Sequence, residues 1–285
     1  MKCKIDCVYC YLKQAVTCMV LAKIDEDTQH EVIYKLMDEV KQYNREETPA
    51  FNSTKALLKT YELIKIDDPY SEVKKQSNDL ALALYPKLKE YLNTVDDRLY
   101  EALKISVAGN IIDFGPQRDF DVEKELNKIF KFGFTIDHYD KFLQKFETAS
   151  NVLYLGDNAG EIVFDKILVE ELTALGKKVT YVVKDGPILN DATMEDAVYV
   201  GMDKVANVIT NGTNYLGTCI NKLPDKVLDT LKNAEIVISK GQANFESLEH
   251  EEMAKGRVFF MLKVKCDYVA EKSGAKFGDS VFFTR

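Results

Sequence analysis

The spacing of apolar residues divides the chain into two halves. Up to residue 149, apolar side chains recur at helical intervals, as in the stripe Val32, Leu36 and Val40. This pattern predicts helices over residues 8–24, 27–40, 53–64, 70–92, 97–112, 122–130 and 137–148, the fourth interrupted near Pro86. Because short β-branched runs first appear near residue 150, we predict a helical domain over 1–149 and an α/β domain over 150–285.

In the second half, short apolar runs alternate with segments of helical spacing. The runs 151–155, 178–183, 205–210 and 235–239 are predicted strands, and helices are predicted over 161–176, 194–202 and 224–233. Such alternation implies right-handed crossovers and a parallel sheet. The predicted fold class is therefore α/β.

Polar residues follow the predicted strands directly. Gly156-Asp157-Asn158-Ala159-Gly160-Glu161 comes after the first strand, Asn190-Asp191 after the second, and Lys240-Gly-Gln-Ala-Asn244 after the fourth. Parallel strands bring such loops to one edge of the sheet, where open α/β sheets bind ligands. Three oxygen donors and one lysine suit a metal-assisted phosphoryl site. Alternatively, Asp157 or Asn158 simply caps the following helix.

Four motifs together resemble the damage-control phosphatase family, first catalogued as domain of unknown function 89. They are GDNAGE at 156–161, NDAT at 190–193, KGQAN at 240–244 and AGNIIDFG at 108–115. The opening Cys7-Val-Tyr-Cys10 is similar to the start of the prokaryotic branch. The matches span nearly the whole chain in the right order. The resemblance implies a helical amino-terminal domain packed on a Rossmann-like α/β domain.

The resemblance also implies an activity, namely divalent-metal-dependent hydrolysis of small phosphorylated metabolites, with phosphosugars the expected class. The expected cofactor is Mg²⁺, Mn²⁺, Co²⁺ or Ni²⁺, and we expect water rather than Asp157 to attack phosphorus. The expected metal ligands are Asp157, Asn158 and Asp191; the catalytic residues are Asp157, Asp191 and Lys240; the substrate-binding residues are Asn110, Glu161, Asn190, Lys240, Gly241 and Gln242. Ala243 departs from the family's usual glycine, which would reshape the pocket slightly.

Composition narrows the possible partners. With 285 residues and a net charge of −8, the chain shows no basic surface of the kind that binds nucleic acid. It contains no apolar run of about 18 residues, so no membrane span is predicted. The expected partner is a small phosphorylated metabolite, and the expected localisation is cytoplasmic. Lys184, at a strand end, is expected to be solvated.

The cysteines allow a different chemistry. Cys3, Cys7 and Cys10 have the spacing that holds an iron-sulfur cluster in radical S-adenosylmethionine enzymes, and Cys18 is a possible fourth thiol. Zinc binding by these amino-terminal cysteines is a related alternative. Against this interpretation, the motif follows no strand, and the next residues are helical instead of a glycine-rich cofactor loop. The other interpretation is that Cys7 and Cys10 are reduced, buried small residues.

Two further alternatives stay open. An S-adenosylmethionine-dependent carboxyl methyltransferase has been proposed within the same family, although GDNAGE lacks the three-glycine spacing of a dinucleotide loop. A ligand-binding module without catalysis is also compatible with the fold. Within AGNIIDFG, Asn110 is either a substrate contact or a locally bonded residue at a helix end.

Overall fold

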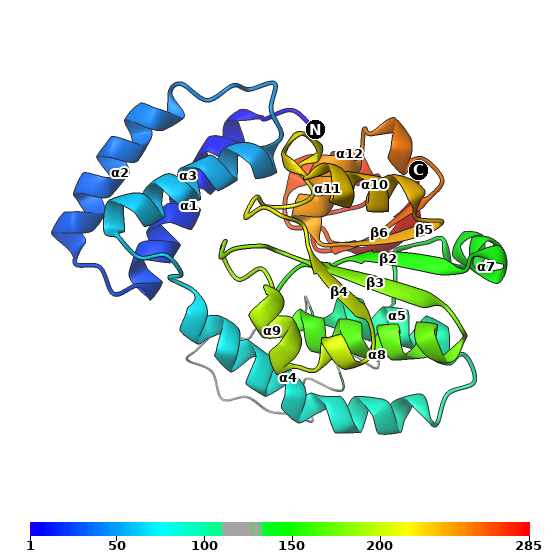
Figure 1. Cartoon of the computed structure of the whole chain (residues 1–285). Helices are drawn as coiled ribbons and strands as arrows, with labels where there is room; N and C mark the ends of the chain where they lie inside the picture. Colours follow the sequence, from blue (N-terminus) through cyan, green and yellow to red (C-terminus); the bar gives the residue numbers. More distant parts are fainter. Residues whose placement is uncertain (110–126, 128–130, 132) are drawn as a thin grey trace.

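The computed structural model describes residues 1–109, 127, 131 and 133–285. A twisted sheet lies between two layers of helices, and three amino-terminal helices form a lobe to one side of it (Figure 1). Asn110 and most of the predicted helix 122–130 lie outside the described residues, so both remain predictions.

The lobe consists of α1 (Ile5–Leu21), α2 (Glu26–Val40) and α3 (Pro49–Ile64). The side chain of Asp25 caps α2, and Thr48 caps α3 with Pro49 in its first turn. Both helices therefore begin before the predicted residues, because Asp25 already caps α2 and the Thr48-Pro49 signal already starts α3. Four buried side chains form the centre of the lobe: Tyr11, Ala15, Leu36 and Ala56.

The next helices, α4 (Ser71–Leu92) and α5 (Arg98–Ala108), belong to the layer beneath the sheet. Leu88 and Leu103 share one hydrophobic cluster with Ile167 of α8 (Glu161–Ala174). α7 (Tyr139–Thr148) contributes Phe142 to the same hydrophobic cluster. Packing on α8 thus joins residues on both sides of position 149. The predicted division into domains 1–149 and 150–285 stays a prediction.

The interruption predicted near Pro86 is wrong, since α4 is continuous through it. The proline removes one hydrogen bond close to the end of a long helix. Burial of Leu84 and Leu88 on either side of the proline offsets this loss.

In the described ranges, seven strands form the sheet in the order β1-β7-β6-β5-β2-β3-β4. The four predicted strands are β2 (Asn151–Leu155), β3 (Lys178–Val183), β4 (Asn207–Thr210) and β5 (Ile236–Lys240), all mutually parallel. β6 (Val258–Lys263) extends this parallel set, whereas β7 (Ser280–Thr284) pairs antiparallel to it. β1 (Ile136–Asp137) pairs parallel with β7 and lies within the half predicted to be helical.

The chain direction across the sheet reverses between β2 and β5. From β2 the chain moves outward through β3 and β4, and then returns to place β5 on the other side of β2. Such a switch point opens a crevice at the carboxyl ends of the two central strands. The GDNAGE and KGQAN segments follow these two strands.

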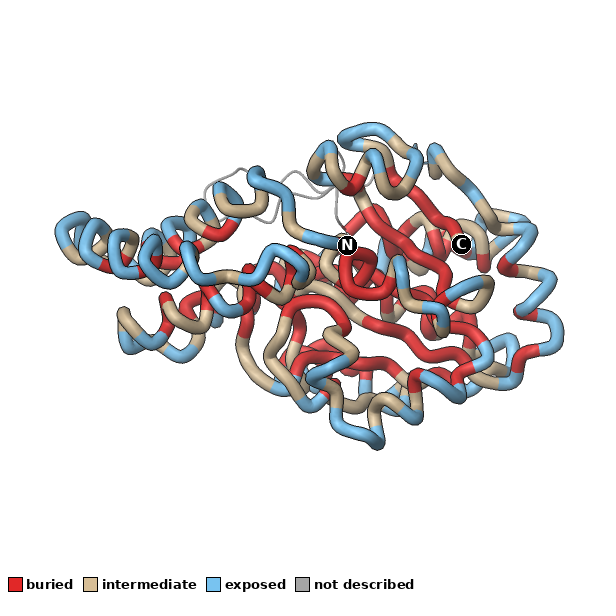
Figure 2. Tube along the Cα trace, turned by 90° about the horizontal axis from the view of Figure 1, so that it is seen from above, coloured by how far each residue is buried: buried red, intermediate tan, exposed pale blue. Residues whose placement is uncertain are grey.

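Both faces of the sheet are covered. The helices α8, α4, α5 and α9 (Met194–Tyr199) lie on one face, and α10 (Asp225–Asn233), α11 (Gln242–Leu248) and α12 (Asp267–Ser273) lie on the other (Figure 1). Burial is continuous along the strands and patchy in the amino-terminal lobe (Figure 2). None of the helices in the described ranges is long and apolar enough to cross a membrane.

Candidate active site

Backbone hydrogen bonds hold the loops after β2 and β3 together. Ala159 N donates to Asn190 O at 2.8 Å, and Ala192 N donates to Asp157 O at 2.8 Å. Asn158 and Asp191 form a short antiparallel bridge. The fold therefore brings the three predicted metal ligands onto two interlocked loops, as expected for neighbouring parallel strands.

The chain leaving β5 passes directly against Asp157. Gly241 has φ +81°, and a Cβ atom built on it would lie 1.9 Å from Asp157 Oδ2. Glycine is required here for two reasons: the left-handed backbone and the close approach of the carboxylate. This residue, predicted to bind substrate, packs against Asp157 in the described structure.

A cavity of about 360 Å³ opens in front of these loops. Its floor includes Asp157, Asn158, Asn190, Asp191 and Gln242. Helices α1 and α3 of the amino-terminal lobe form the opposite wall, with side chains Cys7, Cys10, Tyr11, Gln14 and Ser53. The volume suits a small metabolite. Five of the predicted site residues thus line one cavity between the lobe and the sheet.

Burial raises the pKa of Asp157 well above its usual value, and the nearby carboxylates Glu161 and Asp191 raise it further. Burial also raises the pKa of Asp191 to about 6, although the Lys184 ammonium opposes this shift. Like charges that raise each other's pKa are stabilised by a cation bound between them. The floor of the cavity therefore has the electrostatics of a cation site.

These residues also fit a hard divalent cation chemically. Two carboxylates and one amide oxygen are donors that Mg²⁺ or Mn²⁺ accepts, and Asn158 Nδ2 already donates to Asp157 Oδ2 at 3.1 Å, which leaves the amide oxygen for another partner. In the described part of the chain, no group of three or more His, Cys, Asp and Glu residues is placed to hold a metal. The predicted set contains only two such residues, so this finding does not bear on it.

Two lysines differ from what the sequence led us to expect. Lys184 is buried rather than solvated, because its ammonium donates to Gly217 O at 2.5 Å and lies 3.6 Å from Asp191 Oδ2. Lys240 is fully buried, and its Nζ lies 2.6 Å from Ser106 O and 2.9 Å from Asp165 Oδ1. Neither ammonium lines the cavity. The phosphate-binding role of Lys240 stays a prediction, but its hydrogen-bonding partners here are protein groups.

Glu161 likewise lies beneath the loop. It is the first residue of α8 and is only 4% exposed. Its Oε1 accepts a hydrogen bond from Asn158 Nδ2 at 2.8 Å, and its Oε2 lies 3.2 Å from Lys240 Nζ. Glu161 therefore contacts a predicted metal ligand and is not among the residues that line the cavity. Its predicted role in substrate binding stays a prediction.

The structure adds two cavity residues that the sequence reasoning missed. Lys265 follows β6 and lines the rim, where its positive charge counteracts the raised pKa of Asp157 and of Asp191. Glu246 of α11 is buried, and burial raises the pKa of its carboxyl to about 7. The strand β6 was the available signal, because its apolar run 258–262 is another segment whose carboxyl end reaches the same edge.

The cysteines, for which an iron-sulfur cluster is one alternative, are free thiols in different surroundings. Cys7 and Cys10 are not buried as expected: Cys7 is partly exposed and Cys10 is exposed, because both line the cavity together with Cys266. Cys18 is buried in a separate apolar cluster with Leu57. Cys3 Sγ lies 2.9 Å from the Tyr11 hydroxyl. Within the described ranges, no set of thiols is arranged to hold iron or zinc. The iron-sulfur alternative therefore receives no support from the geometry of residues 3–18.

Known proteins resemble this chain in sequence and in architecture. Residues 3–281 match the family model described as the damage-control phosphatase ARMT1-like domain. A damage-control phosphatase of Pyrococcus horikoshii is 33% identical over 95% of this chain and 94% of its own. One from Archaeoglobus fulgidus is 33% identical over 96% of both chains. The crystal structure of a DUF89 family protein from P. horikoshii has a TM-score of 0.92 and 30% identity, covering 100% of this chain and 99% of that one. The chain therefore belongs to the ARMT1-like damage-control phosphatase family.

Proposed function

We propose that the protein hydrolyses phosphate monoesters of small metabolites at the cavity between the amino-terminal lobe and the sheet, with the help of a divalent cation. Family membership supports a metabolite phosphatase. The observation that carries the proposal is that Asp157, Asn158 and Asp191 meet at the cavity floor, where burial, together with nearby carboxylates, raises the pKa of both carboxyls.

In this proposal Asp157, the Asn158 amide oxygen and Asp191 hold the cation. A cation there would neutralise phosphate oxygens and make water more acidic. Lys265 at the rim meets the remaining negative charge of the phosphate. Asn190 and Gln242 on the floor, with Gln14 and Ser53 on the opposite wall, offer neutral hydrogen-bonding groups to the organic part of the substrate.

Those neutral groups favour a polyhydroxylated substrate. Amide and hydroxyl side chains can each donate and accept, as sugar hydroxyls do. We therefore propose phosphosugars as the substrate class. Cys7, Cys10 and Tyr11 supply the less polar part of the wall, against which the carbon-bound hydrogens of a sugar ring would pack.

A panel of phosphorylated metabolites, assayed for phosphate release with and without added Mg²⁺, Mn²⁺, Co²⁺ or Ni²⁺, tests the proposal. Sugar phosphates should be the best substrates, and a chelator should remove the activity. Asp157→Ala and Asp191→Ala should each lower turnover at least ~100-fold at saturating metal. Full activity in either purified, folded variant would refute the proposed site.

A further inference from the structure

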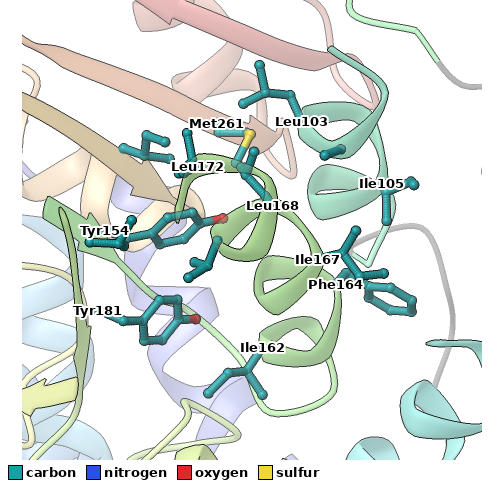
Figure 3. Packing of buried hydrophobic residues seen from close by; sticks show 14 of the residues in the cluster. Leu103, Ile105, Tyr154, Ile162, Phe164, Ile167, Leu168, Leu172, Tyr181 and Met261 are labelled. Atoms are coloured by element: carbon teal, nitrogen blue, oxygen red, sulfur yellow. The ribbon is translucent and has the colours of Figure 1, made fainter. Parts of the chain in front are cut away.

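Beneath the cavity floor, one buried carboxylate gathers hydrogen-bond donors from four elements. Asp165 of α8 has no exposed surface. Its Oδ1 accepts from Ser106 Oγ at 2.6 Å, from the Tyr154 hydroxyl at 2.8 Å and from Lys240 Nζ at 2.9 Å; its Oδ2 accepts from the Tyr181 hydroxyl at 2.8 Å. Figure 3 shows both tyrosine hydroxyls directed from the sheet toward α8. Each carboxylate oxygen of Asp165 therefore has at least one hydrogen-bond donor within the protein.

Lys240 connects this carboxylate to the loop above. Its ammonium lies between Asp165 Oδ1 and Glu161 Oε2, at 2.9 and 3.2 Å, and also donates to Ser106 O at 2.6 Å. Burial alone lowers the pKa of the Lys240 ammonium, but the two carboxylates outweigh burial and raise the pKa above its usual value. Lys240 is therefore a permanent cation whose three protons have protein acceptors.

The connection continues from Glu161 to the loop. Glu161 Oε1 accepts from Asn158 Nδ2 at 2.8 Å, and the same Nδ2 donates to Asp157 Oδ2 at 3.1 Å. Two carboxylates thus hold the nitrogen end of one amide. If the amide were turned round, its oxygen would face both carboxylates and be repelled.

We propose that Glu161, Lys240 and Asp165 are positioning residues that keep the Asn158 amide with its oxygen available to the catalytic cation. The inference rests on the proposed function, because it assumes that Asn158 is a metal ligand. Lys240 then acts through Glu161 and does not touch the phosphate. Hydrogen-bonding partners behind the ligands commonly set metal affinity in this way.

A purely structural role would make a different prediction. If these residues only fasten α8 to the sheet, their replacement lowers the unfolding temperature and leaves metal affinity unchanged. Direct phosphate binding by Lys240 would lower turnover, again with metal affinity unchanged. Metal affinity measured without substrate therefore separates the positioning role from both alternatives.

Glu161→Gln is the principal test, with Mn²⁺ binding followed by calorimetry on the purified full-length chain. The new amide must point its NH₂ group at Lys240 or at Asn158, so one of the two hydrogen bonds is lost. We expect Mn²⁺ affinity to fall ~10–100-fold. Glu170→Gln is the matched control, because Glu170 lies on the same helix and pairs with Lys89 at 2.7 Å, away from the cavity. Its Mn²⁺ affinity should equal that of the wild type.

Unchanged Mn²⁺ affinity in Glu161→Gln overturns the inference. If Glu161→Gln does not fold, Glu161→Asp replaces it; this shorter carboxylate cannot reach both partners and should weaken Mn²⁺ binding by a smaller factor. Asp157→Ala is measured alongside. Loss of Mn²⁺ binding there with wild-type binding in Glu161→Gln rejects only the inference, whereas wild-type binding in Asp157→Ala rejects the proposed metal site itself.

Discussion

Carboxylates lie on two sides of the first turns of α8, and the charges around them differ in sign. On the cavity side, Asp157 and Asp191 lie near each other and near Glu161, and burial with this repulsion raises the pKa of Asp157 far above its usual value. On the sheet side, Asp165 accepts hydrogen bonds from a lysine, a serine and two tyrosines. The protein itself therefore supplies the groups that balance the charge of Asp165.

The contrast shows where an external charge is needed. A buried carboxylate surrounded by donors is a finished structural element. Buried carboxylates that lie close together on a cavity floor repel each other, and a bound cation relieves this repulsion. The chain thus uses residues of the same type for a fixed support and for a binding site. The difference lies in the donors that β2, β3, α5 and β5 supply to one side only.

The largest expected effect tests the support side. Asp165→Asn removes the anion that pairs with fully buried Lys240, so the free energy of unfolding should fall by ~3–5 kcal/mol, as when one partner of a buried ion pair is lost. Urea denaturation measures it. Glu170→Gln, which breaks a partly exposed pair, should cost at most ~1 kcal/mol. Equal losses of unfolding free energy in the two variants would mean that Asp165 stabilises the fold no more than the partly exposed Glu170 does.

The second prediction concerns the cavity side and has the opposite sign. Asp157→Asn removes one of the repelling charges, so the metal-free protein should be stabilised by ~0.5–2 kcal/mol near neutral pH while phosphatase activity is lost. Thermal unfolding in the presence of a chelator measures the gain. Destabilisation instead would mean that Asp157 is held by favourable contacts, as Asp165 is.

The cation at the cavity rim provides a third test. If Lys265 meets the phosphate, Lys265→Ala should raise KM for the best substrate ~10-fold, a loss of about 1.4 kcal/mol, with little change in Mn²⁺ affinity. Lys263→Ala is the matched control two residues earlier on β6. Steady-state phosphate release compares them. Equal KM values in the two variants would remove Lys265 from the proposed site.

The fourth prediction extends the comparison to Glu246, a third cavity carboxyl. Its pKa in the folded protein, about 7, is higher than the ordinary value of 4.5. The folded state therefore favours the protonated carboxyl, and this stabilisation is present below pH 4.5 and lost as the pH rises through 7. The slope should reach ~1.4 kcal/mol per pH unit at most. Denaturation curves at several pH values should show a shallower decline in Glu246→Gln than in the wild type.

The smallest effect is expected at the thiols of the opposite wall. Cys7→Ser/Cys10→Ser replaces neutral side chains that do not contribute to the charges of the carboxylates around α8. Phosphatase activity should stay within ~2-fold, with at most a modest loss of stability. A brown, oxygen-sensitive protein that loses its colour in this double variant would instead support an iron-sulfur cluster.

Local patterns were enough to predict much of the fold. The bounds of β2 and β3 follow from apolar runs that end at polar residues, and the four predicted strands are all present in one parallel set. The convergence of Asp157, Asn158 and Asp191 also follows from the sequence, because parallel strands must deliver their loops to one edge. β6 and β7 were not predicted, although their apolar runs complete the sheet.

The direction of individual side chains depended on the tertiary structure. Lys240 and Lys184 look like strand-end lysines in the sequence, but distant segments bury both: Ser106 and Asp165 surround the first, and Gly217 accepts from the second. Lys265 and Glu246 join the cavity only because β6 and α11 fold back toward the loops. A sequence fixes backbone periodicity locally, whereas the partner of a long charged side chain is set by segments that meet it only after folding.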